Sequence, residues 1–373
     1  MIFSSLRTVA FRNLADATVN TSSKAVFLVG ENGQGKTNFL EAIYFCAYGS
    51  SFRGSRDADV AVEGKSGKKE FSVAATVNDK QSGNDIENEI LVKLEKDKKN
   101  IFIDGKKAED RKELLSVIPC IVFCHEDMEF VKGSPEQCRW FFDQVLSLYD
   151  LVYLEDLRCY RRTIRSRNAV LRDNLKGKLS ENVQTMLDAL DTQCAYYGTR
   201  LMEKRETASV LFSDVFEPLY NEVSGISGMV VKYLPSWKSF NEKENLEALA
   251  KRRGIDMATG LSMTGPHRDR YLFAVGNNDF VSTASTGQRR LLALLLRVAQ
   301  ARRFSETTGR KSVLLLDDVL LEMDGEKRRR FLSVIPGYDQ AFFTFLPDEP
   351  FHHYLSGDTL VYNVKNGRLE ERQ

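Results

Sequence analysis

The fold of this chain is decided by the stretch Gly30-Glu31-Asn32-Gly33-Gln34-Gly35-Lys36-Thr37, which follows the apolar run Ala25 to Val29. The spacing G-x-x-x-x-G-K-T after a strand and before a helix is typical of a loop whose backbone N–H groups surround a phosphate. It predicts a helix over 36–47 whose positive N-terminal end faces the loop. We therefore expect this stretch to bind a nucleoside triphosphate.

Two positions in the loop and one distant motif carry the expected chemistry. Lys36 is expected to reach the β- and γ-phosphates, and the Thr37 hydroxyl is expected to ligate Mg²⁺. The apolar strand Val313 to Leu316 ends in Asp317 and Asp318. Asp317 is expected to hold Mg²⁺ through water, and Asp318 to polarise the attacking water. The sequence thus predicts an ATP and Mg²⁺ site with Lys36 and Asp318 as catalytic residues.

Composition sets broad bounds on the class of protein. The chain has 373 residues, 42% of them hydrophobic, and a formal net charge of +1. Its apolar runs, such as Leu291 to Leu296, are far shorter than the ~20 residues of a membrane span, and its N-terminus does not resemble a secretory signal. We expect a cytoplasmic protein without a membrane partner. Because the net charge is near zero, any DNA footprint must be local.

The order of the patterns predicts an α/β head interrupted by helices. Alternating apolar residues after the first helix, such as Phe71, Val73, Ala75 and Val77, indicate an antiparallel β lobe. From Leu148 to Val223 the pattern is helical, with an apolar stripe on the second helix and a partner stripe on the first. The stripe of the second helix comprises Leu187, Leu190, Cys194, Tyr197, Leu201, Ala208, Leu211 and Val215. We expect a mixed-sheet ATPase head over 1–147 and 254–373, with a helical arm inserted over 148–253 whose turn lies near Gly177 and Ser180.

The first helix of the arm is basic on one side. Arg158, Arg162, Arg165 and Arg172 recur at helical spacing, and Arg167 is nearby. Such a stripe is expected to follow a phosphate backbone, so we assign these four residues to DNA binding. A solvated arginine face paired with acids elsewhere is the alternative.

A second anion site is predicted before the long helix Leu291 to Arg303. Ser285, Gly287 and Gln288 precede this helix, and a serine cap leaves N–H groups that favour an anion. The chain has only one complete triphosphate loop. A twofold pair in which each Ser285 cap closes on the γ-phosphate of the other chain would use both sites, as in ABC-type ATPases.

These motifs resemble the RecF family, bacterial recombination and replication-repair ATPases related to the heads of structural-maintenance-of-chromosomes proteins. The resemblance runs nearly end to end, and its motifs are Phe11-Arg12-Asn13, Gly30 to Asn38, Ser51-Phe52-Arg53, Ser55-Arg56-Asp57, Phe123 to Asp127, Val131 to Pro135, Arg167-Asn168, Gly265 to Asp269, Ser285 to Gln288 and Leu315 to Asp324.

The resemblance implies an ABC-type head, with Ser285, Gly287 and Gln288 as a signature motif acting in trans and Asn38 within the nucleotide loop. It implies Glu322-Met323-Asp324 as the D-loop, Thr344 at the switch position and Glu126 at the Q-loop. The spacing of Arg12 fits either a nucleotide contact or a solvated strand end, and we assign it to the nucleotide.

The resemblance also implies a biological role. It implies a weak DNA-stimulated ATPase, an ATP-dependent homodimer that clamps single-stranded, gapped or double-stranded DNA, action with RecR and RecO in loading recombinase, and support of SOS induction. Two other classes stay open. One is a subunit of a transporter ATPase, which would lack the basic arm, and the other is a structural head that binds ATP without hydrolysing it.

Overall fold

The computed structural model describes residues 1–63, 69–79, 86–175, 180–320, 323 and 325–372. The chain forms two compact units, one comprising Met1–Asp127 with Gln300–Gln373 and the other Met128–Ala299. The sequence-based boundaries at 147/148 and 253/254 stay a prediction. Within these described ranges, no helix combines the length and the apolar character that a membrane crossing requires.

A six-stranded sheet forms the centre of the first unit. Its order is β16 (Arg368–Glu371), β15 (Thr359–Lys365), β3 (Ala25–Val29), β14 (Ala341–Phe345), β13 (Val313–Leu316) and β9 (Cys120–Phe123). Neighbouring strands from β15 to β9 are parallel, and only β16 is antiparallel to its partner. Every residue of β3, β13, β14 and β9 is buried, which is why these strands read as continuous apolar runs. The predicted strands at 26–29 and 313–316 are confirmed.

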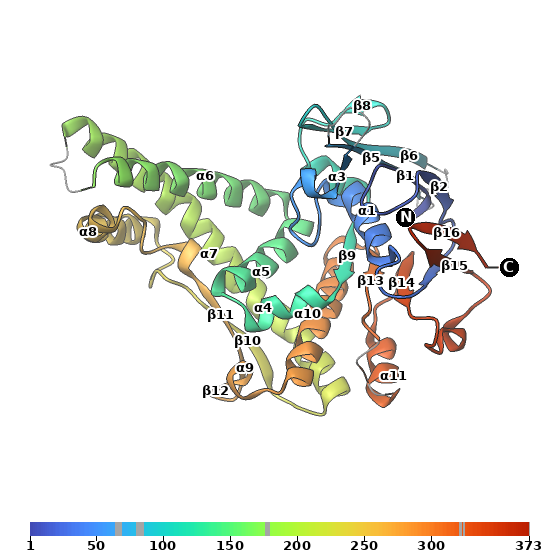
Figure 1. Cartoon of the computed structure of the whole chain (residues 1–373). Helices are drawn as coiled ribbons and strands as arrows, with labels where there is room; N and C mark the ends of the chain where they lie inside the picture. Colours follow the sequence, from blue (N-terminus) through green and yellow to red (C-terminus); the bar gives the residue numbers. More distant parts are fainter. Residues whose placement is uncertain (64–68, 80–85, 176–179, 321–322, 324, 373) are drawn as a thin grey trace. The chain divides into compact units, whose positions relative to one another are not determined.

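An antiparallel lobe forms the second layer of this unit. Its order is β2 (Ala17–Asn20), β1 (Ile2–Val9), β5 (Lys69–Asp79), β6 (Ile86–Glu95), β7 (Lys98–Ile103) and β8 (Lys106–Lys107), with β4 (Val62–Glu63) paired to β5. The helix α1 (Lys36–Tyr48) packs against both sheets, because one core cluster contains its residues with Val26 and Leu28 of β3 and Val73 and Val92 of the lobe (Figure 1). The remaining helices are α2 (Asp57–Val60), α3 (Lys112–Val117), η1 (His125–Asp127), α11 (Gly325–Val334) and η3 (Phe351–Tyr354).

The first strand ends before the Phe11-Arg12-Asn13 motif. The observed β1 ends at Val9 because Ala10 and Arg12 adopt left-handed backbone conformations, with φ of 52° and 51°. A strand cannot continue through such positions. The backbone of Phe11 is not part of a strand and pairs with Ala61 in an isolated β-bridge.

The second unit is mainly helical. It contains α4 (Met128–Lys132), α5 (Pro135–Tyr149), α6 (Leu151–Asp173), α7 (Glu181–Ser224), β10 (Met229–Leu234), α8 (Glu242–Thr259), η2 (Pro266–Arg268), β11 (Arg270–Val275), β12 (Asn278–Asp279) and α9 (Phe280–Thr283). The helix α10 (Thr286–Thr308) begins here and continues into the first unit. The predicted pairing of the two arm helices is confirmed, since α6 and α7 share a core that includes Tyr160 and Cys194 (Figure 1). Gly177, near the predicted turn, lies outside the described residues, and Ser180 caps α7.

The predicted apolar stripe of α7 is correct at its N-terminal end and wrong at its C-terminal end. Leu187, Cys194 and Leu201 are fully buried, but Leu211 is 37% exposed and Phe212 is buried instead. The reason is that a helix turns every 3.6 residues, so a stripe written with a seven-residue repeat drifts off the buried face.

Candidate functional site

The glycines of the phosphate loop are required by its backbone path. Gly35 has φ of 116°, and Gly33 has φ of 76°, conformations that other residues adopt at a cost. A Cβ on Gly30 would lie 2.4 Å from the backbone oxygen of Val364, so only glycine fits there. No atom lies within 4 Å of a Cβ built on Gly33, which leaves this side of the loop open for a ligand.

Lys36 lies across the mouth of the loop. Its Nζ donates hydrogen bonds to the backbone oxygens of Gly30 at 2.6 Å and Glu31 at 3.2 Å, and its side chain is buried. The loop, Lys36 and Asp318 line a hollow of about 290 Å³. The predicted residues from Glu31 to Asn38 therefore surround one concave space, with the exception of Gln34.

The end of β13 meets the start of α1 at two oxygen-bearing side chains. Thr37 Oγ1 donates to Asp317 Oδ1 at 2.9 Å, and Thr344 Oγ1 lies 3.3 Å from the same oxygen. Burial, and then the neighbouring Asp318 carboxylate, raises the pKa of Asp317 to about 6. A hydroxyl and a buried carboxylate are ligands that Mg²⁺ accepts, and a divalent cation would offset the cost of burying this charge. These residues therefore fit Mg²⁺.

Asp318 is held by the strand beside it. Its backbone N–H donates to Thr344 Oγ1 at 2.7 Å, and its Oδ1 accepts from that hydroxyl at 2.9 Å. Its φ of 50° is left-handed, which turns the residue out of the strand direction. Asp318 is among the residues that line the hollow.

Arg12 and Arg53 share a buried carboxylate behind the loop. Glu41 is fully buried and accepts from Arg12 Nε at 3.0 Å and Arg12 Nη2 at 2.9 Å, while Arg53 Nη1 lies 3.8 Å away. Arg53 also donates to Asn38 Oδ1 at 3.1 Å and lines the hollow. Arg53 belongs to the Ser51-Phe52-Arg53 motif of the resemblance, from which no role was predicted for it. The motif was the feature of the sequence that pointed to Arg53. The structure places Arg53 beside the phosphate loop, where it bonds Asn38.

The C-terminal hairpin contacts the phosphate loop directly. Between β15 and β16, the backbone N–H of Asn366 donates to Gln34 Oε1 at 2.7 Å, and that of Gly367 donates to Gln34 O at 2.8 Å. Asn366 and Gly367 form the turn with left-handed φ values of 49° and 75°. From the other side, Asn13 Nδ2 donates to the oxygen of Gly33 at 3.2 Å. The loop is thus held from both ends of the chain.

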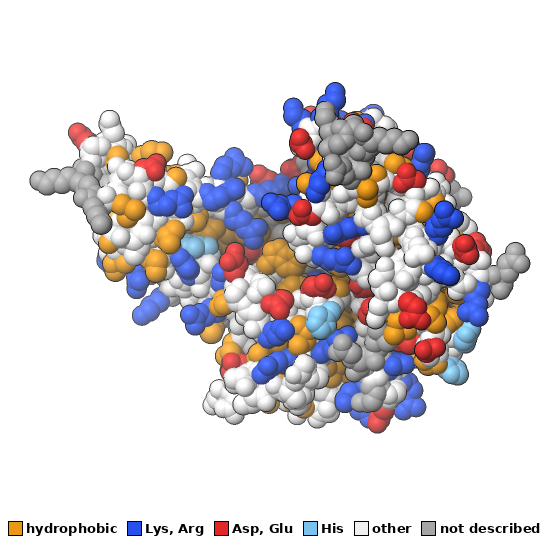
Figure 2. Space-filling model, viewed as in Figure 1, with side chains coloured by type: hydrophobic (Ala, Val, Ile, Leu, Met, Phe, Trp, Pro, Cys, Tyr) orange, Lys and Arg blue, Asp and Glu red, His pale blue; other side chains and the backbone are white. Residues whose placement is uncertain are grey.

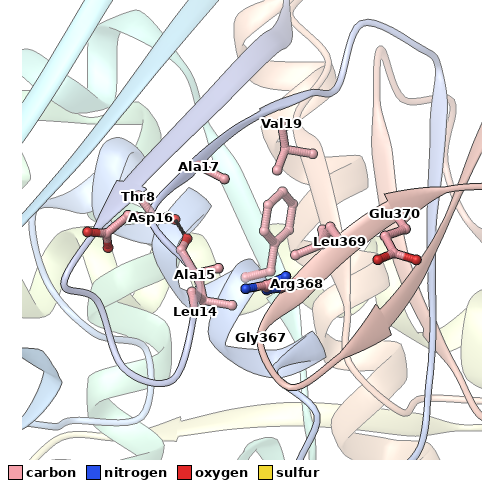
Figure 3. A pocket seen from close by; sticks show the side chains of 11 residues that line it. Thr8, Leu14, Ala15, Asp16, Ala17, Val19, Gly367, Arg368, Leu369 and Glu370 are labelled. Carbon is pink, nitrogen blue, oxygen red and sulfur yellow. Dashed lines mark hydrogen bonds between the residues drawn. The ribbon is translucent and has the colours of Figure 1, made fainter.

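The hairpin turn also borders a second hollow, of about 300 Å³. Figure 3 shows Leu14 and Ala15, from the segment after β1, opposite Leu369 of the hairpin. Thr8 Oγ1 fixes this segment by donating to the oxygen of Ala15 at 3.1 Å. This hollow therefore lies next to the C-terminal hairpin that supports the phosphate loop.

The second unit contains the predicted signature motif. Ser285 and Gln288 form a reciprocal cap at the start of α10, because Ser285 N–H donates to Gln288 Oε1 at 2.8 Å and Gln288 N–H donates to Ser285 Oγ at 3.3 Å. No atom lies within 4 Å of a Cβ built on Gly287. Among the described residues, the space beside Gly287 is therefore not filled by other segments of the chain.

Comparison with known proteins identifies the chain. A family model described as the RecF/RecN/SMC N terminal domain matches residues 2–356. A DNA replication and repair protein RecF of Treponema pallidum (strain Nichols) is 41% identical over 364 residues, which cover 97% of this chain and 99% of that protein. The chain belongs to the RecF family. A Bacillus subtilis (strain 168) RecF is 30% identical over 377 residues, covering 99% of this chain and all of that protein.

Solved structures agree with the RecF assignment. A structure described as the recombination mediator protein RecF-ATP in the RecFOR pathway has a TM-score of 0.88 and 26% identity, covering 100% of this chain and 97% of that one. An SMC head bound to the C-winged helix domain of ScpA has a TM-score of 0.52 and 15% identity, covering 99% and 97%. The latter shows the fold alone. The predicted α/β ABC-type head with a helical insertion is confirmed, and RecF-family membership places the chain among proteins of DNA replication and repair.

The four arginines assigned to DNA in this RecF-family chain lie on α6, where Lys and Arg side chains gather in Figure 2. Arg162, Arg165 and Arg172 are exposed, whereas Arg158 lies 3.9 Å from Glu155. Arg167, expected near the stripe, is instead buried between Asp191 at 2.6 Å and Asp256 at 2.7 Å. Its two ion pairs make it a structural element of the arm.

The resemblance also assigns roles to Glu126 and to the D-loop. Glu126 is exposed in η1. Glu322 and Asp324 of the D-loop lie outside the described residues, as does Leu321, so their role stays a prediction.

Proposed function

We propose that this chain binds ATP and Mg²⁺ in the hollow beside its glycine loop and acts as an ATP-dependent DNA-binding protein of recombinational repair. The observation that carries the proposal is that Asp317, at the end of β13, lies 2.9 Å from Thr37, which lines the hollow together with Lys36. The structural similarity to a RecF–ATP complex supports ATP as the nucleotide.

Each residue of the site has a distinct task. The backbone of residues 30–37 and the ammonium of Lys36 bind the phosphates, which requires Lys36 to exchange its bonds to Gly30 and Glu31 for phosphate oxygens. Thr37 and Asp317 would hold Mg²⁺, which supplies positive charge to the β- and γ-phosphate oxygens. Asp318 orients the attacking water and accepts its proton, and Arg53 adds a cation at the edge of the hollow.

ATP also joins two copies of the chain in this proposal. The N-terminal N–H groups of α10, with Ser285, Gly287 and Gln288 around them, form an anion site without a phosphate loop of its own. A twofold dimer supplies the γ-phosphate from the partner's loop. ADP lacks that group, so dimerisation is specific for ATP.

DNA is the macromolecular ligand. Arg162 and Arg172 present exposed guanidinium groups along α6, and Arg158 and Arg165 extend the stripe. The ATP dimer would clamp single-stranded, gapped or double-stranded DNA and release it on slow hydrolysis. By family membership it would act with RecR and RecO to load recombinase and would support SOS induction.

The experiment that tests the enzymatic part measures phosphate release by the purified protein with and without DNA. Lys36→Ala is the control, because it removes the phosphate-binding cation. We expect slow release that DNA stimulates and that the variant lacks. ATP binding with release no faster than in the Lys36→Ala variant would favour a structural head that does not hydrolyse ATP.

A further inference from the structure

The second unit contains a basic hollow that the nucleotide site does not use. It has a volume of about 890 Å³ and is lined by residues of α5, α6, α7 and the segment 261–268. Its wall includes five arginines but only two carboxylates, Glu136 and Asp143. The arginines are Arg139, Arg161, Arg165, Arg205 and Arg268. The hollow therefore carries an excess of positive charge.

Two of these arginines are engaged by carboxylates. Arg205 is buried and binds Asp143 at 2.8 Å and Asp269 at 2.8 Å. Arg161 lies 3.0 Å from Asp143. Asp143 forms ion pairs with both Arg161 and Arg205, so its negative charge is already neutralised by these two arginines. Glu136 is the other lining carboxylate, and together with Asp143 and Asp269 it acts on Arg139 through its negative charge.

The other three arginines lack a carboxylate partner within the described part of the chain. Each donates only to a backbone oxygen: Arg139 at 2.6 Å, Arg165 at 3.2 Å and Arg268 at 3.4 Å. Guanidinium groups of this kind retain donors for the paired oxygens of a phosphate. Their common location gives the hollow the chemistry of a polyanion site.

The segment from Gly265 to Asp269 is the scaffold that positions Arg268. Asp269 is buried and accepts from Ser236 N–H at 2.8 Å, and Arg205 donates to the oxygen of Pro266 at 2.8 Å. His267 lies between Tyr160 Oη and Ser262 O, both at 2.9 Å from its ring nitrogens. Since burial lowers the pKa of His267 to about 4, it is neutral near pH 7 and adds no charge to the hollow.

An aromatic ring adds a second kind of contact. Trp140 lines the hollow and is 41% exposed, with its ring 5.6 Å from that of Phe130. Leu157 and Ile164 of α6 provide apolar wall beside it. An exposed ring next to unpaired guanidinium groups is how proteins bind single-stranded nucleic acid, with a base on the ring and phosphates on the cations. A duplex would keep its bases stacked inside and could not use the ring.

We propose that this hollow binds a short segment of single-stranded DNA, with a base stacked on Trp140 and phosphates held by Arg139, Arg165 and Arg268. The proposal rests on the proposed function, because it assumes that the chain binds DNA, and it adds the location and the strand form. An acidic peptide would meet the same charges, but the exposed ring favours a planar base.

The protein carries its own probe for this site. It has two tryptophans, and Trp237 is only 2% exposed, so quenching by a stacked base reports on Trp140. Unlabelled oligothymidylate is titrated into the full-length protein with ATP at low salt. We expect saturable quenching that Trp140→Phe abolishes. Trp140→Ala is expected to weaken binding of labelled oligothymidylate by about 5- to 100-fold.

Arginine variants test the phosphate contacts. Arg165→Ala and Arg268→Ala should each flatten the slope of log K against log salt by about 0.7. Arg252→Ala is the matched control, because Arg252 is an exposed arginine of α8 that does not line the hollow. Thermal melting of every variant checks that the unit remains folded.

Three results would overturn the proposal. Equal quenching and equal affinity for polyglutamate would assign the hollow to an acidic peptide. Binding of labelled oligothymidylate without Trp140 quenching would place single-stranded DNA elsewhere and leave the proposed function intact. No binding of single-stranded or duplex DNA, with or without ATP, would contradict the proposed function as well.

Discussion

The backbone N–H of Asn366 donates a 2.7 Å hydrogen bond to Oε1 of Gln34, so the C-terminal hairpin holds the phosphate loop from 332 residues away in the chain. Gly367 adds a bond to the backbone oxygen of Gln34 at 2.8 Å. The geometry of the nucleotide site therefore depends on a segment that contains none of the nucleotide motifs.

Gly367→Ala tests this dependence. The new Cβ would lie 1.8 Å from the oxygen of Asn13, and the residue has φ of 75°. We expect a loss of unfolding free energy of more than about 1 kcal/mol and weaker ATP binding, measured by chemical denaturation and nucleotide titration. Gly357→Ala is the matched control, since nothing lies within 4 Å of its Cβ. Unchanged ATP affinity in Gly367→Ala would contradict the proposed support.

Gln34→Ala removes only the side-chain acceptor. A hydrogen bond of this kind contributes about 0.5–1.5 kcal/mol, so ATP affinity should fall about 2- to 10-fold if the bond keeps the loop in its binding conformation. Isothermal titration with ATP measures the change. An affinity equal to that of the unmodified protein would mean that the backbone bond to Gly367 is sufficient.

Asp317→Asn separates stability from cation binding. The pKa of Asp317 is raised to about 6, above the ~3.9 of an unfolded aspartate, so its stabilising contribution is complete below pH ~4 and is lost as pH rises through about 6. Without nucleotide or Mg²⁺, the variant should therefore be more stable than the unmodified protein at pH 7.5 by about 1–3 kcal/mol. The difference should shrink at pH 4.5. Denaturant unfolding at both pH values measures it.

The same variant should lose the effect of Mg²⁺ on ATP binding. Thr37→Val is a companion variant, because it removes the hydroxyl that we propose as the other Mg²⁺ ligand without removing a charge. An Asp317→Asn protein that is less stable than the parent at pH 7.5 would show that the buried carboxylate stabilises the fold.

Asp318→Asn addresses turnover. Most ABC-type ATPases place a glutamate after the Mg²⁺-binding aspartate, and Asp318 is one methylene shorter, which sets its carboxylate back by roughly 1.5 Å. A general base works within about 2.6–3.2 Å of its water, so hydrolysis should be slow. The variant should keep ATP binding and dimerisation but prolong the dimer on DNA. Single-turnover hydrolysis at the unmodified rate would remove Asp318 from the mechanism and make Glu322 the next candidate.

The stripe on α6 is tested by its salt dependence. The double variant Arg162→Ala/Arg172→Ala removes two exposed cations and should flatten log K for DNA against log salt by about one to two units. A charge-matched control is Lys251→Ala/Arg252→Ala on α8. The same slope in both double variants would assign the stripe to solvent or to a protein partner.

Local motifs made the fold and the centre of the site predictable. The motif residues stand directly beside recognisable secondary-structure patterns: the strand before Gly30, the helix from Lys36 and the acidic end of β13. The positions of these elements can therefore be predicted from a few consecutive residues. The resemblance placed Thr344 at the switch position. The structure adds its bond to Asp318.

Relationships between distant segments were not predictable. The residues around Asn366 carry no pattern that predicts its hydrogen bond to Gln34. The role of Arg53 likewise depends on a contact with Asn38 that forms only when the segment after α1 folds back. Arg167 illustrates the same limit, because the sequence places it near the basic stripe while Asp191 and Asp256 on other helices enclose it. The pattern of charged residues on one helix does not reveal which of those side chains another helix covers.

The central claim is that ATP joins two copies through Lys36 of one chain and Ser285 of the other, and light scattering with ATP, with ADP and without nucleotide tests it most directly. We predict that the unmodified protein forms a dimer with ATP but not with ADP or without nucleotide. The Ser285→Arg variant should stay a monomer with ATP, because the larger side chain blocks the start of α10. The variant should bind ATP with nearly unchanged affinity, because Ser285 does not line the hollow of the chain's own phosphate loop. Dimerisation of Ser285→Arg with ATP, or equal dimerisation with ADP, would contradict the account.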